Sequence, residues 1–322
     1  MTHMLEPRPD KVLATADVAL LGLLARLKAD GYAFVTPTPA THAHILKRPD
    51  RREAHSLRDI LGWSLPFERV SADPAILAAL EQAGMIADEG RLARSRIRVS
   101  SLHGDLYLHS AFPTTAEDAV FFGPDSYRFA DLIERELAAA PLGEGAHIVD
   151  IGTGAGVGAI VAARVCPLAR LTMTDINPMA LRLATLNATA AGVQASAVLG
   201  GDLDGVPGDI DIALANPPYI IDEAGRHYRD GGDMHGGAVA LRMAQDAVGR
   251  LALGGRLILY TGSAIIDGKD PLAAALGEIA AGAGCIMRYR ELDPDIFGEE
   301  MARPAYADVE RIAVVSAIIE RP

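Results

Sequence analysis

The stretch "HIVDIGTGAGVG", residues 147–158, decides how the second half of the chain folds. Residues 147–151 form a short, largely apolar run that is typical of a buried strand. Glycines then stand at every second position from 152 to 158, and glycine lets a backbone turn sharply and approach a ligand closely. The next residues, to about Val165, have a helical pattern. The stretch therefore predicts a strand, a ligand-binding loop and a helix.

The same alternation of strand and helix continues to the end of the chain. Asn177 caps a predicted helix with Pro178 in its first turn, another helix is predicted from Val239 to Leu253, and a third starts at Pro271. Strands are predicted at 170–175, 196–202, 210–216, 256–262, near 285–291 and at 311–319. This order predicts an α/β fold, a doubly wound parallel sheet of seven strands with helices on both faces.

The first part of the chain has a different pattern. Short helices are predicted at 18–28, after Pro39, at 56–63 and at 74–83, and the alternation across 91–110 predicts a hairpin. We therefore expect a smaller helical, winged-helix-like domain at residues 1–115 that recognises substrate, followed by a catalytic domain at 116–322.

Composition restricts the class of protein. Half of the 322 residues are hydrophobic, which suits a large core, but no stretch approaches the ~20 apolar residues of a membrane span. Two cysteines are too few for a disulfide framework or a cysteine-based zinc site. We expect a cytoplasmic protein without a membrane partner.

Charge is distributed unevenly. The formal net charge is −12, and residues 1–140 carry 16 Lys and Arg against 19 Asp and Glu, whereas 141–322 carry 14 against 23. In the near-neutral first part, Arg94, Arg96 and Arg98 alternate along a predicted strand, and Lys47–Arg52 forms a basic cluster. Both groups are interpreted as solvated surface, with a phosphate-binding or substrate-docking face as the alternative.

The glycine loop and Asp175, at the end of the second strand of the sheet, predict an adenosine-containing cofactor, because a carboxylate there accepts hydrogen bonds from a ribose diol. A nicotinamide cofactor and S-adenosylmethionine both fit this pair. Asp150 lies beside the loop, where a carboxylate repels a pyrophosphate and attracts an ammonium group. Asp202 ends the third strand, where it could accept from an adenine amino group. These residues favour S-adenosylmethionine.

The segment "ALANPPYI", residues 213–220, places an asparagine, two prolines and a tyrosine after a buried strand. Proline cannot donate to a sheet ladder, so the strand must end at Asn216. These side chains would then face the crevice at the carboxyl edge of the sheet.

Four segments in order, "VDIGTGAGVGAI", "TDINPMAL", "GGDL" and "ANPPYI", resemble the class I S-adenosylmethionine-dependent methyltransferases, which have a Rossmann-like domain. Among these the chain is most similar to the methyltransferase small domain group, which includes protein-glutamine N-methyltransferases of release factors and several RNA-base N-methyltransferases. The resemblance covers about residues 120–322, starting with "FFGPDSYRFADLI" (121–133), which would close over the methionine end of the cofactor.

The resemblance also implies roles for individual residues. Asn216 and Pro217 would accept hydrogen bonds from the acceptor NH2, and Tyr219 would stack on the planar acceptor group. Pro218 and Tyr219 would contact the substrate. Independently of the resemblance, Tyr228 and Arg229 in the glycine-rich stretch 225–237 are expected to be available for substrate contact. The implied cofactor-binding residues are Asp150, Gly152, Thr153, Gly154, Gly156, Asp175, Ile176, Asn177, Asp202, Leu203 and Asn216.

The acceptor is the open question. A glycine-rich stretch at 225–237, interpreted as a lid, and an insertion at 291–313 depart from the glutamine-modifying enzymes. An amide or amine of a protein or small molecule is favoured; a nucleic-acid base is the alternative, and a non-catalytic binding module is a further one. Two histidine groups, His42 with His44 and His227 with His235, are not expected to bind a metal. The oligomeric state is left open.

Overall fold

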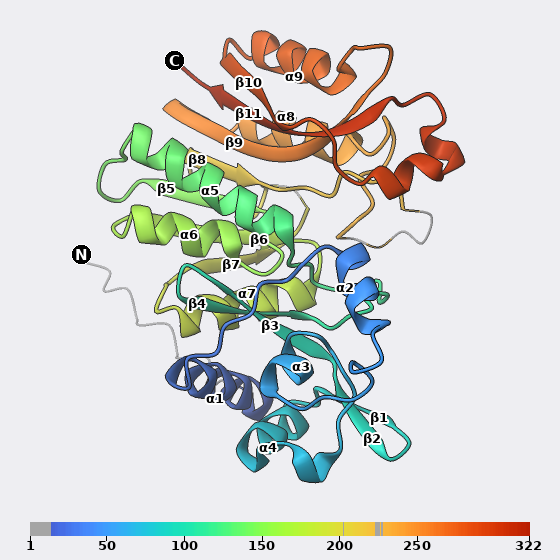
Figure 1. Cartoon of the computed structure of the whole chain (residues 1–322). Coiled ribbons are helices and arrows are strands. Elements are labelled where there is room, and N and C mark those ends of the chain that lie inside the picture. Colours follow the sequence, from blue (N-terminus) through green and yellow to red (C-terminus); the bar gives the residue numbers. More distant parts are fainter. Residues whose placement is uncertain (1–13, 202, 223–225, 227) are drawn as a thin grey trace, which may run out of the picture.

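The computed structural model describes residues 14–201, 203–222, 226 and 228–322. A seven-stranded sheet has the order β10-β11-β9-β8-β5-β6-β7 (Figure 1). Its strands are β5 (His147–Ile151), β6 (Arg170–Asp175), β7 (Ser196–Leu199), β8 (Ile210–Ala215), β9 (Leu251–Ile265), β10 (Ile286–Asp293) and β11 (Arg311–Glu320). The predicted number of strands is confirmed.

One strand departs from the predicted parallel arrangement. β11 pairs antiparallel with both β9 and β10, whereas β5, β6, β7, β8 and β9 pair in parallel. A strand that runs opposite to its neighbour needs no crossover helix. The segment 294–310 between β10 and β11 accordingly contains only the short 3₁₀ helices η2 (Gly298–Ala302) and η3 (Pro304–Tyr306).

Helices cover both faces of the sheet, as a doubly wound fold requires. The helices are α5 (Pro124–Ala139), α6 (Val157–Val165), α7 (Pro178–Ala190), α8 (Ala238–Val248) and α9 (Pro271–Gly282). Buried residues of α5, α6 and α7 share one apolar cluster with one face of the sheet, and those of α8 and α9 share a second cluster with the other face. The predicted helix 239–253 is too long, because Leu251 already starts β9.

The N-terminal part forms a helical layer with two hairpins. Its helices are α1 (Thr15–Ala29), α2 (Pro39–Leu46), α3 (Leu57–Leu61), α4 (Pro74–Gln82) and the 3₁₀ helix η1 (Arg69–Ser71). β1 (Ile86–Glu89) pairs with β2 (Leu92–Ser95), and β3 (Ile97–Leu102) pairs with β4 (Asp105–Ser110). The predicted hairpin 91–110 is thus confirmed only from residue 97 onward, since residues 92–95 belong to the preceding hairpin.

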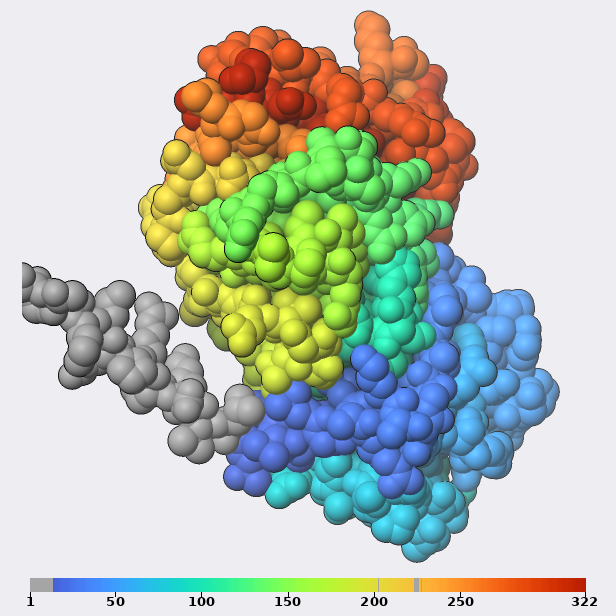
Figure 2. Space-filling view, turned by 90° about the vertical axis from the view of Figure 1, so that its left-hand side faces the viewer, coloured from blue at the N-terminus to red at the C-terminus, as the bar shows by residue number. Residues whose placement is uncertain are grey.

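The N-terminal part packs directly on the sheet-bearing part through α7. The Asn187 side chain accepts from the N–H of Leu108 at 2.8 Å and donates to its carbonyl at 3.0 Å. Arg182 donates to Asp17 at 2.8 Å. One apolar cluster runs through both parts, and Figure 2 shows the blue N-terminal surface lying against the rest of the chain.

Candidate active site

The site lies where the order of strands along the sheet reverses. From β5 the chain builds outward through β6 and β7, then returns to β8 on the other side of β5. Ile151 and Ala215 are register partners in β5 and β8, so the glycine loop and Asn216 start from neighbouring strand ends. Ligands of open α/β sheets bind at this kind of crevice.

The glycine loop has a conformation that requires glycine. Gly152, Gly154 and Gly156 have φ values of 65°, 54° and 86°, in the left-handed region that other residues rarely adopt. A Cβ atom on Gly156 would also lie 3.2 Å from the Cα of Ala184. The loop is therefore held close to α7 while its own backbone faces the crevice.

Asp150 supports this loop from below. Its buried carboxylate accepts from the Thr153 hydroxyl at 2.6 Å and from the N–H of Ala159 at 3.0 Å. A Cβ atom on Gly158 would meet that carboxylate at 2.4 Å. Burial raises the pKa of Asp150 from 3.8 to about 6, although these hydrogen bonds oppose the shift. Asp150 thus fixes the turn from β5 into α6.

Asp175 connects two loops at the edge of the sheet. Its carboxylate accepts from the N–H of Gly154 and from the N–H of Asn177, each at 2.9 Å. Asn177 caps α7 by accepting from the N–H of Met179, and it donates to the carbonyl of Asp118. Asp175 and Asn177 therefore position the glycine loop and the start of α7 together.

A first cavity of about 440 Å³ opens above these loops. Eight of the predicted cofactor residues line it: Asp150, Gly152, Thr153, Gly154, Asp175, Ile176, Asn177 and Asn216. Gly156 and Leu203 do not line it, because Gly156 packs on α7 and Leu203 lies in the apolar core. Asp202 lies outside the described residues. Backbone N–H groups, a carboxylate at the end of β6 and apolar walls fit an adenosine group with an amino-acid tail.

Sequence reasoning missed the wall that α8 supplies. Val239, Arg242, Met243 and Asp246 line the first cavity from this helix. A Cβ atom on Gly152 would lie 3.1 Å from the terminal methyl group of Met243, so α8 packs closely against the glycine loop. No motif marks these positions, since they are ordinary turns of an amphipathic helix.

A second cavity, also of about 440 Å³, adjoins the first. Five residues line both: Phe121, Asn216, Pro217, Pro218 and Tyr228. Most of the remaining wall of the second cavity comes from residues 36–40, residues 112–115, the start of α5 and residues 293–299. Asn216 therefore stands between two spaces, and its side chain has no hydrogen-bond partner among the residues that the structure describes.

Of the two cavities, Tyr219 lines only the second, and its side chain is held by a hydrogen bond and by ring packing. Its phenol donates to Asp125 at 2.8 Å, and Asp125 also accepts from Tyr260 at 2.8 Å. A Cβ atom on Gly262 would lie 2.2 Å from the Tyr219 ring, so the ring fits only because this position is glycine. The ring also packs edge-on against Phe297. Burial raises the pKa of Tyr219 well above its usual value.

The predicted lid is partly outside the described residues, and its described part is anchored. The Tyr228 phenol donates to the carbonyl of Thr114 at 2.9 Å, and its ring is parallel to Phe121 with centroids 6.0 Å apart. Arg229 forms an ion pair with Glu300 in the insertion. Tyr228 and Arg229 thus both line the second cavity, and they tie the lid to the N-terminal part and to the insertion.

The three alternating arginines do not form one strip. Arg94 lies on β2 and pairs with Glu89 of β1 at 2.6 Å. Arg96 is exposed between β2 and β3, and Arg98 is buried on β3. The interpretation as a solvated face fails because β2 and β3 belong to different hairpins. In the basic cluster, Lys47, Arg48 and Arg52 are exposed, whereas Arg51 pairs with Asp59 at 2.7 Å.

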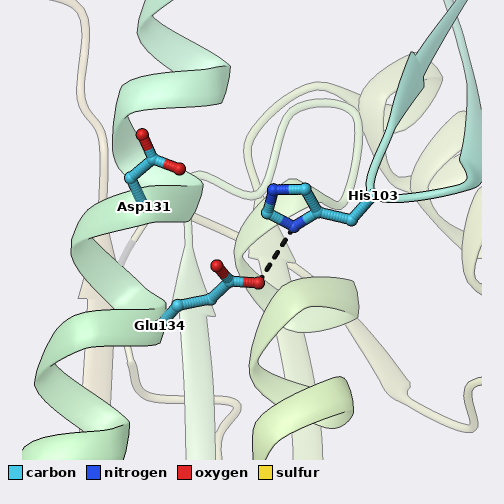
Figure 3. A group of neighbouring side chains, drawn as sticks. All are labelled: His103, Asp131 and Glu134. Carbon is cyan, nitrogen blue, oxygen red and sulfur yellow. Dashed lines mark ion pairs between the residues drawn. The ribbon is translucent and has the colours of Figure 1, made fainter.

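Of the histidines considered as metal ligands, His227 lies outside the described residues. His42 is buried, binds the carbonyl of Trp63 at 2.9 Å and stacks on Phe112. Among the described residues, one surface group combines three potential ligands, His103, Asp131 and Glu134 (Figure 3). His103 projects from the turn between β3 and β4 and pairs with Glu134 at 2.9 Å, while Asp131 and Glu134 both project from α5. This group lines neither large cavity.

The comparisons with known proteins agree with the geometry. Residues 130–281 match the family model described as "Methyltransferase small domain". The chain is 30% identical over 208 residues to the ribosomal RNA small subunit methyltransferase C of Pseudomonas putida (strain W619), covering 61% of this chain and 55% of that protein. It is 27% identical over 196 residues to the protein of that name from Ectopseudomonas mendocina, covering 57% and 52%.

A relative whose name gives a different acceptor matches at a similar identity. The chain is 29% identical over 209 residues to the release factor glutamine methyltransferase of Deinococcus radiodurans, covering 64% of this chain and 73% of that protein. The chain spans about half the length of the ribosomal RNA methyltransferases that it matches.

Fold, site and matches together define the class, an S-adenosylmethionine-dependent methyltransferase domain. The match of residues 130–281 to the methyltransferase small domain model agrees with the family that the sequence motifs predict. No helix within the described residues is long and apolar enough to span a membrane.

Proposed function

We propose that this protein is an N-methyltransferase that acts on a planar amide or amine nitrogen, with the cofactor in the first cavity and the acceptor in the second. The observation that carries the proposal is the shared wall, because Asn216, Pro217 and Pro218 line both cavities. A methyl group transferred from a cofactor in the first cavity to an acceptor in the second would move past these shared residues. Its residues are therefore placed to orient the nitrogen that receives the methyl group.

Asp175, the glycine loop and Asn177 would hold the cofactor. The Asp175 carboxylate faces the first cavity at the end of β6, where it can accept from a ribose diol. The backbone of residues 152–155 can approach the amino-acid end closely. S-adenosylmethionine, when bound, supplies a methyl group on a positively charged sulfur.

Asn216 and Pro217 would prepare the acceptor. The nitrogen of an amide or aromatic amine is a poor nucleophile, because its lone pair is delocalised into a planar group. Two acceptors, the Asn216 side-chain oxygen and the Pro217 carbonyl, can take both N–H bonds and orient the lone pair toward the shared wall. Two prolines keep the backbone in place. As the N–C bond formed, the bond from the methyl carbon to sulfur would break, leaving a neutral thioether. The proton becomes acidic once the nitrogen has been methylated and can pass to water, so no strong base is required.

We propose that Tyr219 positions the turn, in addition to the expected stacking on the acceptor. Its phenol is bound by Asp125 and its ring is packed against Gly262 and Phe297. We propose that Tyr219 fixes the end of the Asn-Pro-Pro-Tyr turn, presenting the rest of its ring to the second cavity. Tyr228, parallel to Phe121 on the shared wall, offers a further aromatic surface to a planar acceptor.

A nucleic-acid base is the second candidate acceptor, favoured by the two relatives named as ribosomal RNA methyltransferases. The net charge of −12 repels a polyanion, and ion pairs already occupy two of the candidate phosphate contacts, Arg94 and Arg51. We therefore place an amide or amine of a protein or small molecule first. Residues 36–40 and 112–115 in the cavity wall support a role of the N-terminal part in acceptor recognition.

The test is to identify the labelled product. The purified protein is incubated with radioactive S-adenosylmethionine and an extract, with the Asn216→Ala variant as control. We expect label that survives nuclease and requires Asn216. Label that nuclease removes and protease leaves would replace the proposal with the nucleic-acid alternative, and absence of any transfer together with absence of cofactor binding would refute both.

A further inference from the structure

Four arginines line the second cavity, and three of them are neutralised by carboxylates. Arg226 pairs with Asp222 at 2.5 Å, Arg229 pairs with Glu300, and Arg128 pairs with Asp293 at 3.1 Å. The fourth arginine is Arg98. It forms no ion pair with any described residue, although its side chain is the most deeply buried of the four.

Arg98 belongs to β3, and only 5% of its surface is exposed. Its Nε donates to the carbonyl of Ser110 at 3.0 Å. The two terminal nitrogens have no hydrogen-bond partner among the described residues. They are not fully buried atoms, so solvent or a ligand can reach them. Arg98 also lines the second cavity, so this buried guanidinium borders the space in which we place the acceptor.

The neighbours of Arg98 do not compensate its charge. The groups that interact with it electrostatically are the phenols of Tyr32, Tyr127 and Tyr228 and the imidazoles of His42 and His109. Burial lowers the pKa of Arg98 to about 10, so the guanidinium stays charged at neutral pH. Burial and the Arg98 charge lower the pKa of His42 to about 4, so that ring is neutral. A buried charge without a partner is costly, and proteins generally pair such charges.

A second positive element faces the same cavity. Residues 36–40 line it, and they lead into α2, whose first helical residue is Pro39. The N-terminus of a helix carries partial positive charge and free N–H groups, which favour an anion. In α2, Pro39 has no N–H and Thr38 accepts from the N–H of Thr41, which leaves the N–H of Ala40 as the donor for an anion.

We propose that Arg98, together with the N-terminus of α2, binds an oxyanion, a carboxylate or a phosphate, that is part of the methyl acceptor. This inference rests on the proposed function, and it adds a second requirement to the substrate. The acceptor would place its planar nitrogen at Asn216 and its oxyanion at Arg98 within the same cavity of about 440 Å³. Such a molecule explains why one arginine was left without a carboxylate of its own.

The experiment compares pairs of probes that differ only in the anion. Binding to the protein saturated with S-adenosylhomocysteine is measured by calorimetry for adenosine 5′-monophosphate against adenosine, and for 4-carboxybenzamide against benzamide. We expect the anionic member of one pair to bind at least about tenfold more tightly, as hydrogen bonds to a charged group predict. The pair that shows this preference identifies phosphate or carboxylate as the natural group.

The variants assign the preference to Arg98. Arg98→Met should abolish it, while Arg128→Met, which removes a guanidinium already paired with Asp293, should retain it. Equal losses in both variants, or no preference for either anion in the wild-type protein, would overturn the proposal. If Arg98→Met does not fold, Arg98→Lys retains the charge without the planar fork and should show a partial loss. Binding of S-adenosylhomocysteine by the wild-type protein tests the proposed function separately.

Discussion

The phenol of Tyr219 donates a hydrogen bond of 2.8 Å to the carboxylate of Asp125, which lies 94 residues earlier in the chain. The contact joins the turn after β8 to the first turn of α5. Asp125 accepts from Tyr260 on strand β9 as well. The proposed acceptor-orienting turn is therefore fixed from outside its own segment.

Tyr219→Phe removes one of the two phenols from Asp125. The free energy of unfolding should fall by roughly 1.5–3 kcal/mol, as for a hydrogen bond to a charged group. Turnover should also fall, because the turn that carries Asn216 loses its anchor, while affinity for S-adenosylhomocysteine is retained. Tyr260→Phe is the matched control. It should cost similar stability in urea unfolding but little turnover, and equal turnover losses would contradict the anchoring role.

Asp175→Ala should raise the dissociation constant of S-adenosylhomocysteine at least about tenfold, because a carboxylate that accepts from a ribose diol contributes one or more charged hydrogen bonds. The same carboxylate also orders Gly154 and Asn177. Calorimetry measures the constant, and circular dichroism verifies that the fold is intact. An unchanged constant would remove Asp175 from the cofactor site.

Asn216→Ala separates chemistry from cofactor binding. Loss of one preorganised acceptor should reduce turnover by roughly a hundredfold or more. Cofactor affinity should change much less, since Asn216 is one of many residues around the first cavity. Steady-state kinetics and calorimetry on the same preparation provide the comparison. If turnover survives while cofactor binding is lost, Asn216 is a cofactor residue and the proposed mechanism is wrong.

Asp150 predicts a pH dependence of stability in the free protein. Its pKa is raised from 3.8 to about 6 by burial, so the folded state holds the proton more tightly than the unfolded chain. This contribution to stability is complete below the unfolded pKa and is lost as pH rises through about 6. Relative to Asp150→Asn, the wild-type protein should lose about 3 kcal/mol between about pH 4 and about pH 7. Denaturant unfolding at each pH measures the free energy of unfolding of both proteins. If these free energies change with pH to the same extent in the wild type and in Asp150→Asn, the pKa of Asp150 is not raised.

Salt dependence distinguishes the two classes of acceptor. A nucleic acid would have to contact exposed cations such as Arg96, Lys47 and Arg48, so log activity against log salt would have a slope near one per phosphate contacted. An enclosed amide or amine should show only a weak effect. We expect the weak effect, with Arg96→Glu close to wild type. A steep slope that this variant flattens would favour the nucleic acid.

The motifs at the sheet edge could be predicted because local chemistry dictates them. The positive φ values of Gly152, Gly154 and Gly156 suit glycine, and Asn177 is a favoured helix cap. Pro217 lacks the N–H that the next residue of an inner strand would donate, so β8 ends before it. The start of β9 could not be predicted in this way. Leu251 continues the apolar run of α8, and Gly254 and Gly255 resemble a helix stop, whereas they lie within the strand near a register shift.

Arg98 shows the limit of periodicity more clearly. Alternation places Arg94, Arg96 and Arg98 on one face of a single strand, which predicts a shared environment. Their environments are set instead by distant segments, since Arg98 lies among Tyr32, Tyr127 and Tyr228. No spacing within residues 91–110 contains that information. The same holds for the wall that α8 gives to the first cavity.

Much of the wall of the second cavity comes from four stretches that lie outside the motif-bearing loops of the first: residues 36–40, residues 112–115, the start of α5 and residues 293–299. Insertions or exchanges in the first, second or fourth of these stretches would leave the glycine loop, Asp175 and Asn216 in place. Evolution could therefore assign this scaffold a new acceptor while conserving the transfer step. A chimaeric protein that receives these three stretches from a relative offers the same freedom to the protein engineer.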